Sequence, residues 1–469
     1  MTPRPAPPSP SRARSPGAGA CRLLAEPLAS RLGPAEVALL FAADPRPFAL
    51  VGAWAGGGAL VGSEPLRVDQ GRDPFAAVDR LPSVAVTPAP PPGAVGGGWF
   101  GYLGYQLGAR VERLPAPPAR PVPLPPAVLG FYDHLLRYDQ TTGQWWFESL
   151  WTPGRSGALA EKLARCRARL AGPPPPVPAW RAGRFTSTPD RARHLSAVAA
   201  CRAHIAAGDV FQANVCLRLE AAFEGAPAGM LAHALGRLVP PRAAWLEGPW
   251  GAVVSLSPEL YLRRQGRQVV TAPIKGTCPR DPDPAAAARQ RDGLVASAKD
   301  RAENVMIVDL MRNDLARVCR PGTVDVPALV RAEPHPGIWH LVSRVHGILR
   351  DGVRDSDLLR ATFPPGSVTG APKPRAMELI HELESTAREV YTGAIGYASP
   401  LAGLELSVVI RTFELADGRV WLGVGGGVVA DSDPAGEHAE CLAKARPLLH
   451  AIGADLDHGT TDPGGSWHL

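Results

Sequence analysis

One lysine has the residue type and the surroundings for covalent chemistry. Lys275 follows a strand-like run rich in β-branched residues, 268–272, and a turn is expected directly after it, because Gly276 and the proline-bearing stretch 279–282 stop any regular element. A strand end can direct a side chain into a cleft, and a desolvated lysine can become a neutral amine that attacks carbon. On position alone, Lys275 could instead neutralise a buried carboxylate.

Four glutamates could complete such a site. Glu437 and Glu440 are three residues apart and Lys444 follows four residues later, so all three share one face of a predicted helix. Glu303 lies in a second predicted helix, and carboxylates that converge from two helices would suit Mg²⁺, which prefers oxygen ligands. Glu259 stands on a predicted turn, where a desolvated carboxyl can stay protonated near neutral pH. A solvated salt-bridge face and an exposed turn residue are the simpler alternatives.

Glycine-rich segments are further candidates for binding. Gly425, Gly426 and Gly427 offer backbone N–H groups and room for a ligand. The segment 96–101 matches G-x-G-x-x-G, but aromatic residues fill it and no helix pattern follows, which favours a strand that another chain approaches closely. The segment 366–373 has three residues between its glycines and a proline before its lysine, so we do not predict a phosphate loop there.

The elements that position these residues are strands and helices without strict alternation, which favours an α+β fold with large antiparallel sheets. The patterns predict a hairpin over 48–61 and strands at 36–41, 135–138, 144–147, 210–219, 252–256, 260–263, 391–398, 405–414 and 419–424. They predict helices at 158–170, after a cap at 187–190, at 230–238, as one or two helices over 285–318, and at 356–362, 374–384 and 435–452.

Proline-rich segments mark the expected domain boundaries. The proline run 173–176 predicts a linker over 173–186, between an N-terminal β-rich subdomain at 21–172 and a catalytic domain at 187–452. Residues 1–20 and 453–469 are expected to be a disordered leader and a disordered tail.

Composition narrows the class of protein. The 469 residues are 45% apolar and 20% charged, which is typical of a globular protein that can bury a large core. The net charge of +6 is scattered, which argues against a nucleic-acid groove. No apolar run predicts a membrane span or a signal peptide, and seven cysteines without metal-like spacing indicate free thiols. A cytoplasmic protein is expected.

Taken together, these motifs resemble the chorismate-utilising enzymes, and most of all the branch of aminodeoxychorismate synthase component I, the large subunit of para-aminobenzoate synthase. The resemblance is dense over about 187–450 and looser before it. The matching segments are 208–214, 256–259, 273–277, 300–314, 340–343, 363–377, 391–397, 410–412 and 425–444. The fold that the resemblance implies is a sandwich of large antiparallel sheets with helices packed outside.

The resemblance also implies roles for individual residues. Lys275 would add to C2 of chorismate, Glu259 would protonate the departing C4 hydroxyl, and His340 would lie near the ring. Ammonia would then attack C4 and expel the lysine. The implied Mg²⁺ ligands are Glu303, Glu437 and Glu440. The implied substrate-binding positions are Thr277, Thr369, Tyr391, Arg411, Gly425, Gly426, Gly427 and Lys444.

Two positions separate the branches of this family. Anthranilate synthases resemble the chain but have alanine where Lys275 stands, and isochorismate and salicylate synthases have a water-activating lysine where Gln212 stands. The presence of both Lys275 and Gln212 implies amination of chorismate at C4, in a folate or specialised-metabolite route. No glutamine amidotransferase motif is present, so ammonia would come free or from a separate amidotransferase subunit in a heterodimer. The alternatives are anthranilate synthase component I and an inactive docking paralogue.

The resemblance has one departure. The segments 39–42 and 239–243 differ from the family's tryptophan-site motifs, so bound tryptophan is not expected.

Overall fold

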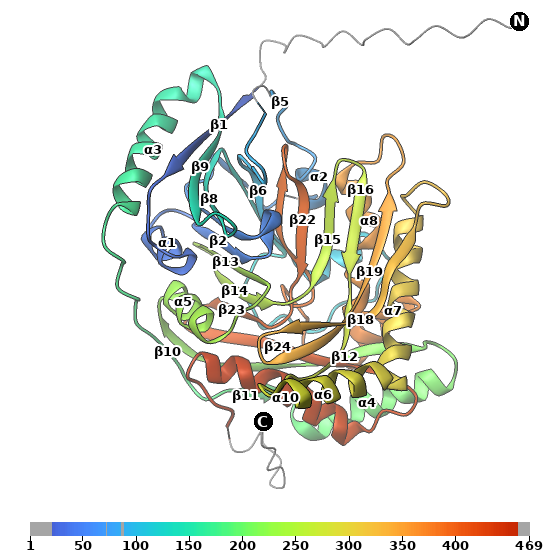
Figure 1. Ribbon diagram of the computed structural model, residues 1–469. Helices are drawn as coiled ribbons and strands as arrows, with labels where there is room; N and C mark the ends of the chain where they lie inside the picture. The colour runs from blue at the N-terminus through green and yellow to red at the C-terminus, as the bar shows by residue number, and fades with distance from the viewer. Residues whose placement is uncertain (1–20, 72, 86–88, 458–469) are drawn as a thin grey trace, which may run out of the picture.

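The computed structural model describes residues 21–71, 73–85 and 89–457 (Figure 1). Within them, the strands form a 14-stranded sheet and a 10-stranded sheet, and every described strand pair is antiparallel except β1 with β5. The expected leader, 1–20, lies outside the described residues, as does the expected tail beyond 457. No helix in the described part of the chain is both long enough and apolar enough to cross a membrane.

The larger sheet is built from both halves of the chain. Its strands in spatial order are β10 (Trp180–Ala182), β12 (Gln212–Gly225), β24 (Arg419–Val428), β23 (Thr412–Ala416), β14 (Gly251–Ser257), β13 (Arg242–Gly248), β2 (Phe48–Gly52), β3 (Gly58–Gly62), β8 (His134–Asp139), β9 (Gln144–Trp151), β1 (Cys21–Leu28) and β5 (Val84–Ala85). Two short strands, β11 (Thr186–Thr188) and β20 (Gly370–Ala371), also pair with β12.

The smaller sheet likewise mixes early and late strands. Its order is β17 (Ile274–Pro279), β19 (Ile338–Ile348), β16 (Gln268–Ala272), β15 (Leu260–Gln265), β22 (Gly403–Val408), β21 (Ala394–Ser399), β6 (Gly98–Leu103), β7 (Ala127–Tyr132) and β4 (Arg67–Asp69), with β18 (Asp325–His335) beside β19. Segments before and after the proline run 173–176 therefore contribute strands to both sheets.

The two sheets face each other across an aromatic core. Phe48 of the larger sheet stacks on Phe100 of the smaller sheet, with ring centroids 4.2 Å apart. Trp54, just after β2, approaches Tyr397 of β21. All four side chains are buried. The sheets therefore form the sandwich that the sequence resemblance implies, closed by interdigitated side chains.

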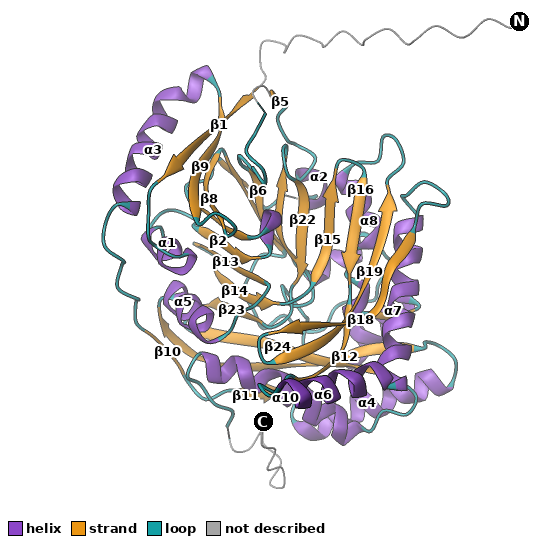
Figure 2. Ribbon diagram, viewed as in Figure 1, coloured by secondary structure: helices purple, strands orange, loops and turns teal. Residues whose placement is uncertain are grey.

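Helices cover the outer faces of the sandwich (Figure 2). Leu231 of α5 and Leu449 of α10 share a buried cluster with Leu422 of the larger sheet. Met311 of α7 is buried together with Val345 of the smaller sheet. The helices are α1 (Pro34–Leu40), α2 (Pro74–Ala77), α3 (Ser156–Leu170), α4 (Arg191–Ala206), α5 (Pro227–Arg237), α6 (Pro284–Ala296), α7 (Ala298–Ala316), α8 (Asp355–Thr362), α9 (Lys373–Leu383) and α10 (Pro434–Ala451).

Most predicted elements are present, and the differences have local causes. The predicted strand 36–41 is wrong, because these residues form α1, with Pro34 in the first turn and the Glu36 carboxylate accepting the Gly33 N–H at 2.7 Å. The predicted strand 405–414 is two strands, β22 and β23, separated near Arg411, whose φ is +52°. The long hairpin of β18 and β19 was not predicted.

Two segments are more ordered than predicted. The expected linker 173–186 contains β10, which pairs with β12. Residues 453–457 of the expected tail are held by the fold, because Phe185 exchanges backbone hydrogen bonds with Asp455 and Asp457 at 2.9 and 2.8 Å. The prediction that 96–101 is a closely approached strand is confirmed: a Cβ on Gly98 would lie 2.2 Å from the Ala398 carbonyl.

Candidate active site

Lys275 lies near the start of β17, at the edge of the smaller sheet that α7 covers. The turn predicted directly after it is wrong, because β17 continues to Pro279. The side chain is half-buried. Burial lowers the pKa of Lys275, and the Lys444 charge adds to this effect, whereas Glu303, Glu259 and Glu440 oppose it. The lysine is therefore a desolvated amine among acids.

Glu259, between β14 and β15, is buried, with 3% of its surface exposed. Burial raises the pKa of Glu259 to about 7, although the Ser367 hydroxyl, the Lys275 charge and the Ile274 N–H favour the charged form. A carboxyl with this pKa can carry a proton near neutral pH and give it up. The predicted turn position is present, and the alternative of an exposed turn residue is wrong.

Three glutamates approach Lys275 and Lys444 from α7 and α10. Burial raises the pKa of Glu303. Burial also raises the pKa of Glu437, whose Oε1 accepts the Ser432 hydroxyl at 2.6 Å. Burial acts in the same direction on Glu440, but Lys444 outweighs it and the pKa of Glu440 is lowered.

Lys444 connects α10 to the glycine strand. Its ammonium lies 2.8 Å from Glu440 Oε1 and donates to the Gly425 carbonyl at 3.0 Å. Lys299 at the start of α7 approaches Glu437 at 4.0 Å. The face of α10 predicted from the spacing thus looks onto β24, with lysines from two helices among its acids.

The glycine strand leaves space for these groups. A Cβ on Gly426 would lie 2.9 Å from Glu437 Oε2, and a Cβ on Gly427 would lie 2.0 Å from Gln212 Nε2. On Gly425 a Cβ would meet the Cys216 sulfur at 2.3 Å. Side chains at these three positions are therefore excluded, because neighbouring side chains lie directly against the backbone of β24.

His340 lies on β19, opposite Thr277 of β17. Its Nδ1 lies 3.0 Å from the Thr277 hydroxyl. Burial lowers the pKa of His340 to about 3, and the charge of Arg411 and the His335 ring act in the same direction. His340 is therefore a neutral imidazole at physiological pH, with Thr277 setting its orientation.

Three further residues predicted to bind substrate are Arg411, Tyr391 and Thr369. Arg411 is within electrostatic reach of both Glu259 and His340. The buried Tyr391 ring packs on Gly423, and its hydroxyl lies 3.8 Å from the Cys216 sulfur. Thr369 is fully buried, and its hydroxyl donates to the Gly366 carbonyl at 3.1 Å, within its own loop.

Sequence reasoning missed three residues of this region. Ser367 faces Glu259 from the segment that failed the phosphate-loop pattern. Lys299 approaches Glu437, and Asn304 donates to the Lys275 carbonyl at 3.4 Å. The position of Asn304 beside Glu303 was an available signal, whereas nothing in the local pattern around Ser367 pointed to an acid far away in the chain.

Carboxylate oxygens are the donors that Mg²⁺ prefers, and Glu303 and Glu440 repel each other in a way that a cation would relieve. The space over Gly426 adjoins Glu437 and Glu440. Within the described residues, however, no three histidine, cysteine or acidic side chains converge as a metal site, so the predicted trio Glu303, Glu437 and Glu440 is not a closed cluster. The donor set fits Mg²⁺ held by one or two carboxylates, with other ligands from waters and a bound anion.

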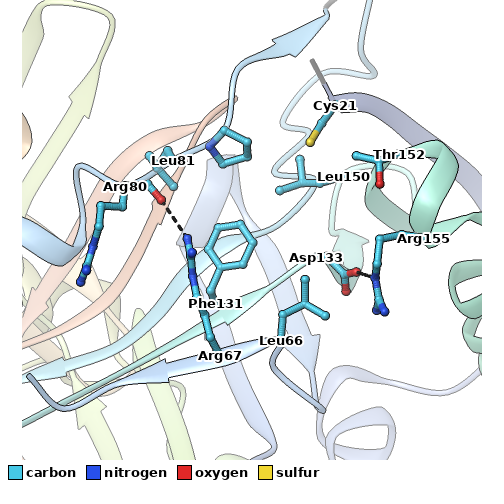
Figure 3. Close-up of a pocket in the computed structure, with 11 residues that line it drawn as sticks. Cys21, Leu66, Arg67, Arg80, Leu81, Phe131, Asp133, Leu150, Thr152 and Arg155 are labelled. Carbon is cyan, nitrogen blue, oxygen red and sulfur yellow. Dashed lines mark hydrogen bonds and ion pairs between the residues drawn. The ribbon is translucent and has the colours of Figure 1, made fainter. Parts of the chain in front are cut away.

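A separate cleft of about 480 Å³ lies among the N-terminal strands (Figure 3). Phe131, Leu66 and Leu150 line it, and Asp133 is paired with Arg155 at 3.0 Å. It contains none of the predicted site residues and lies near β1 and β5, at the end of the molecule opposite β12 and β24 (Figure 1). We therefore place the candidate active site at Lys275.

Comparisons with known proteins show the family of this chain. The family model for chorismate binding enzyme matches residues 64–450. Aminodeoxychorismate synthase component 1 of Salmonella typhimurium is 39% identical over 76% of this chain and 77% of its own. Anthranilate synthase component 1 of Streptomyces coelicolor is 37% identical over 84% and 80%.

Solved structures share the fold. Anthranilate synthase component I from Streptococcus pneumoniae covers 94% of this chain and 95% of its own, with a TM-score of 0.70 and 24% identity. The menaquinone-specific isochorismate synthase of Escherichia coli covers 94% and 96%, with a TM-score of 0.72 and 20% identity. With the family model matching most of its length, the chain belongs to the chorismate binding enzymes.

Proposed function

We propose that the chain aminates chorismate at C4 to give 4-amino-4-deoxychorismate, the precursor of para-aminobenzoate. The observation that carries the proposal is Lys275, a desolvated amine in electrostatic contact with Glu259, Glu303 and Glu440. Relatives named aminodeoxychorismate synthase component 1 support it. Chorismate is a dianion, and Lys444, Arg411 and the glycine backbone of β24 would supply the complementary charges and donors.

The first step uses both perturbed groups. Neutral Lys275 attacks C2 of chorismate, the ring double bonds shift, and the C4–O bond breaks. Glu259, whose burial raises its pKa to about 7, gives its proton to the departing hydroxyl, which leaves as water. Lys275 then carries a secondary ammonium bonded to C2.

The second step restores the enzyme. Ammonia attacks C4, the double bonds shift back, and the C2–N bond breaks with its electron pair returning to Lys275. The new C4 ammonium gives one proton to Glu259. The balance is chorismate plus ammonia to aminodeoxychorismate plus water, and both side chains regain their starting protonation.

Mg²⁺ is the proposed cofactor. When bound, it would neutralise a substrate carboxylate, and the residues that would hold it are Glu303 and Glu440, with Glu437 in support through water. Arg411 and Lys444 bind anionic groups directly. The neutral His340 imidazole is proposed to lie beside the substrate ring, and its 3.0 Å contact with the Thr277 hydroxyl supports a fixed orientation.

The nitrogen source is proposed to be ammonia, either free or delivered by a glutamine amidotransferase subunit. The relatives carry the name component 1, which supports a second subunit. Ammonium-dependent activity of this chain alone should be measurable. Glutamine should replace ammonium only when the second subunit is added.

The test is direct. The protein with chorismate, Mg²⁺ and ammonium, followed by an aminodeoxychorismate lyase, should yield para-aminobenzoate. Lys275→Ala should reduce the rate at least about a hundredfold and abolish the covalent adduct that mass spectrometry detects when ammonium is omitted. Lys162→Met, which removes a buried lysine of α3, is the matched control and should keep wild-type turnover per folded molecule.

Anthranilate synthase is the second candidate, because relatives with that name are also similar to this chain. Anthranilate formation needs attack of ammonia at C2, the carbon that Lys275 would occupy. Fluorescent anthranilate as the main product of the wild type, without the lyase, would reject amination at C4. No turnover of chorismate under any of these conditions would instead favour an inactive docking paralogue.

A further inference from the structure

The strand that carries Lys275 is irregular at that residue. The pairing of β17 with β19 shifts between Ile274 and Thr277. Lys275 and Gly276 therefore stand opposite a single residue of β19, Leu341. Such a β-bulge re-aims a side chain and interrupts the ladder of hydrogen bonds. The direction of the lysine thus depends on what holds the bulge in place.

One buried side chain binds both strands at the bulge. Asn304 of α7 is 1% exposed. Its Nδ2 donates to the Lys275 carbonyl at 3.4 Å and to the Leu341 carbonyl at 3.2 Å. Both acceptors belong to the irregular pairing. The amide of Asn304 therefore takes the place of regular ladder contacts at the residue whose side chain does the proposed chemistry.

The orientation of this amide is itself fixed. The Ser343 hydroxyl donates to Asn304 Oδ1 at 2.5 Å and accepts the Val330 N–H at 2.8 Å. Ser343 is fully buried. Because the hydroxyl uses its one proton on Oδ1, the NH₂ group must face the two carbonyls. Strands β18 and β19 thus support the contact between α7 and β17.

The same helix carries the acid with the largest electrostatic effect on Lys275. Glu303 precedes Asn304 in α7 and acts electrostatically on Lys275. The helix also approaches the bulge closely, because a Cβ on Gly276 would lie 3.0 Å from the Cβ of Asp300. A shift of α7 against β17 would therefore change the distance between Lys275 and Glu303.

We propose that Asn304 is a positioning residue for Lys275: its amide fixes the β17 bulge against α7 and so holds the lysine in register with Glu303 and the substrate ring. This inference rests on the proposed role of Lys275 as nucleophile. Asn304 touches no reacting atom, and its effect passes through the Lys275 backbone. A misplacement of about 1 Å can cost on the order of a hundredfold in rate, so the contact should matter for turnover.

The key variant is Asn304→Asp, which keeps the size and the Ser343 contact but replaces the donor with an oxygen facing two carbonyls. We expect kcat to fall at least about tenfold, with KM for chorismate within about threefold of wild type. The second readout needs no chorismate. Brief acetic anhydride labelling at pH 8, quantified by peptide mass spectrometry, should change at Lys275 severalfold relative to Lys299.

Thr271→Val is the matched control. Thr271 of β16 is buried, and its hydroxyl lies 3.9 Å from the Met311 sulfur of α7, so the variant perturbs the same helix–sheet interface away from the bulge. It should lower the melting temperature without changing kcat or Lys275 labelling. If Asn304→Asp does not fold, Ser343→Ala, which frees the amide to rotate, should show the same two effects more weakly.

The outcomes separate the two proposals. Wild-type kcat and wild-type Lys275 labelling in a folded Asn304 or Ser343 variant would overturn the positioning role, even with a lowered melting temperature. A wild type that does not aminate chorismate would reject the proposed function. Labelling would still test Asn304 in that case, because a change at Lys275 supports the positioning role and unchanged labelling overturns it.

Discussion

Lys444 and Glu440 form an ion pair on α10, with Nζ 2.8 Å from Oε1, on the face that looks onto the glycine strand β24. Their side chains are 45% and 49% exposed, so the pair should add no more than about 1 kcal/mol to folding stability. Its importance lies in the site, where it keeps one positive charge beside the carbonyl of Gly425 and one negative charge within reach of Lys275.

Replacement of Lys444 should therefore affect binding more than folding. We expect Lys444→Met to raise KM for chorismate at least about tenfold, because a charge-assisted hydrogen bond to a carboxylate contributes about 1.5–3 kcal/mol. Steady-state kinetics with ammonium as nitrogen source measure this. Arg446→Met, an exposed cation on the same helix, is the control. An equal loss in both variants would mean that general attraction of the anion, not contact by Lys444, is responsible.

Gly426 should tolerate no side chain for a reason of function. In Gly426→Ala the new methyl group would lie 2.9 Å from Glu437 Oε2 and 3.8 Å from Lys444 Nζ, so it would occupy the space proposed for substrate and cation. We expect kcat/KM to fall at least about a hundredfold, with β24 still paired. Isothermal titration with chorismate and Mg²⁺ should show the loss of binding.

The control for this substitution is Gly236→Ala in α5, where a Cβ meets nothing within 4 Å. It should be neutral or stabilise the protein by up to about 1 kcal/mol, because alanine favours the helix. Retained chorismate binding in Gly426→Ala would contradict the placement of the substrate on β24.

The elements that carry the candidate site residues could be predicted from sequence more fully than the contacts between those residues. The helical period placed Glu437, Glu440 and Lys444 on one face without reference to the rest of the chain. The short apolar run that became α1 could not be assigned, because periodicity does not distinguish a buried strand from one or two helical turns. Ser367 and Asn304 were missed because their partners, Glu259 and Lys275, are distant in sequence and only the folded sheets bring them together.

His340 should stay neutral across the physiological range. Burial lowers its pKa to about 3, so the imidazole remains uncharged at all pH values above about 4. Its resonances in ¹⁵N-histidine NMR spectra should not titrate between pH 5 and 8. Titration of His340 near pH 6.5 would contradict its desolvation and would make it a candidate proton donor.

The raised pKa of Glu259 has two consequences, and both lower a measured quantity as the pH rises. As the proposed acid it must be protonated, so kcat/KM should fall as pH rises through about 7. Folding stability behaves in the same direction. The folded protein keeps the proton above the ordinary pKa of 4.5, so the contribution is complete below pH 4.5 and is lost as pH rises to about 7. The loss is on the order of 3 kcal/mol at this one buried group.

Glu259→Gln separates these effects, because the amide keeps the shape and cannot ionise or give up a proton. The variant should lose at least about a hundredfold in kcat, and its kcat/KM should no longer fall as the pH rises through about 7. Urea unfolding at pH 5 and pH 8 should show that the variant gains stability relative to wild type at the higher pH. A variant that is less active but no more stable than wild type at pH 8 would mean that Glu259 is already ionised in the folded protein. A carboxylate held in that state could not protonate the leaving hydroxyl.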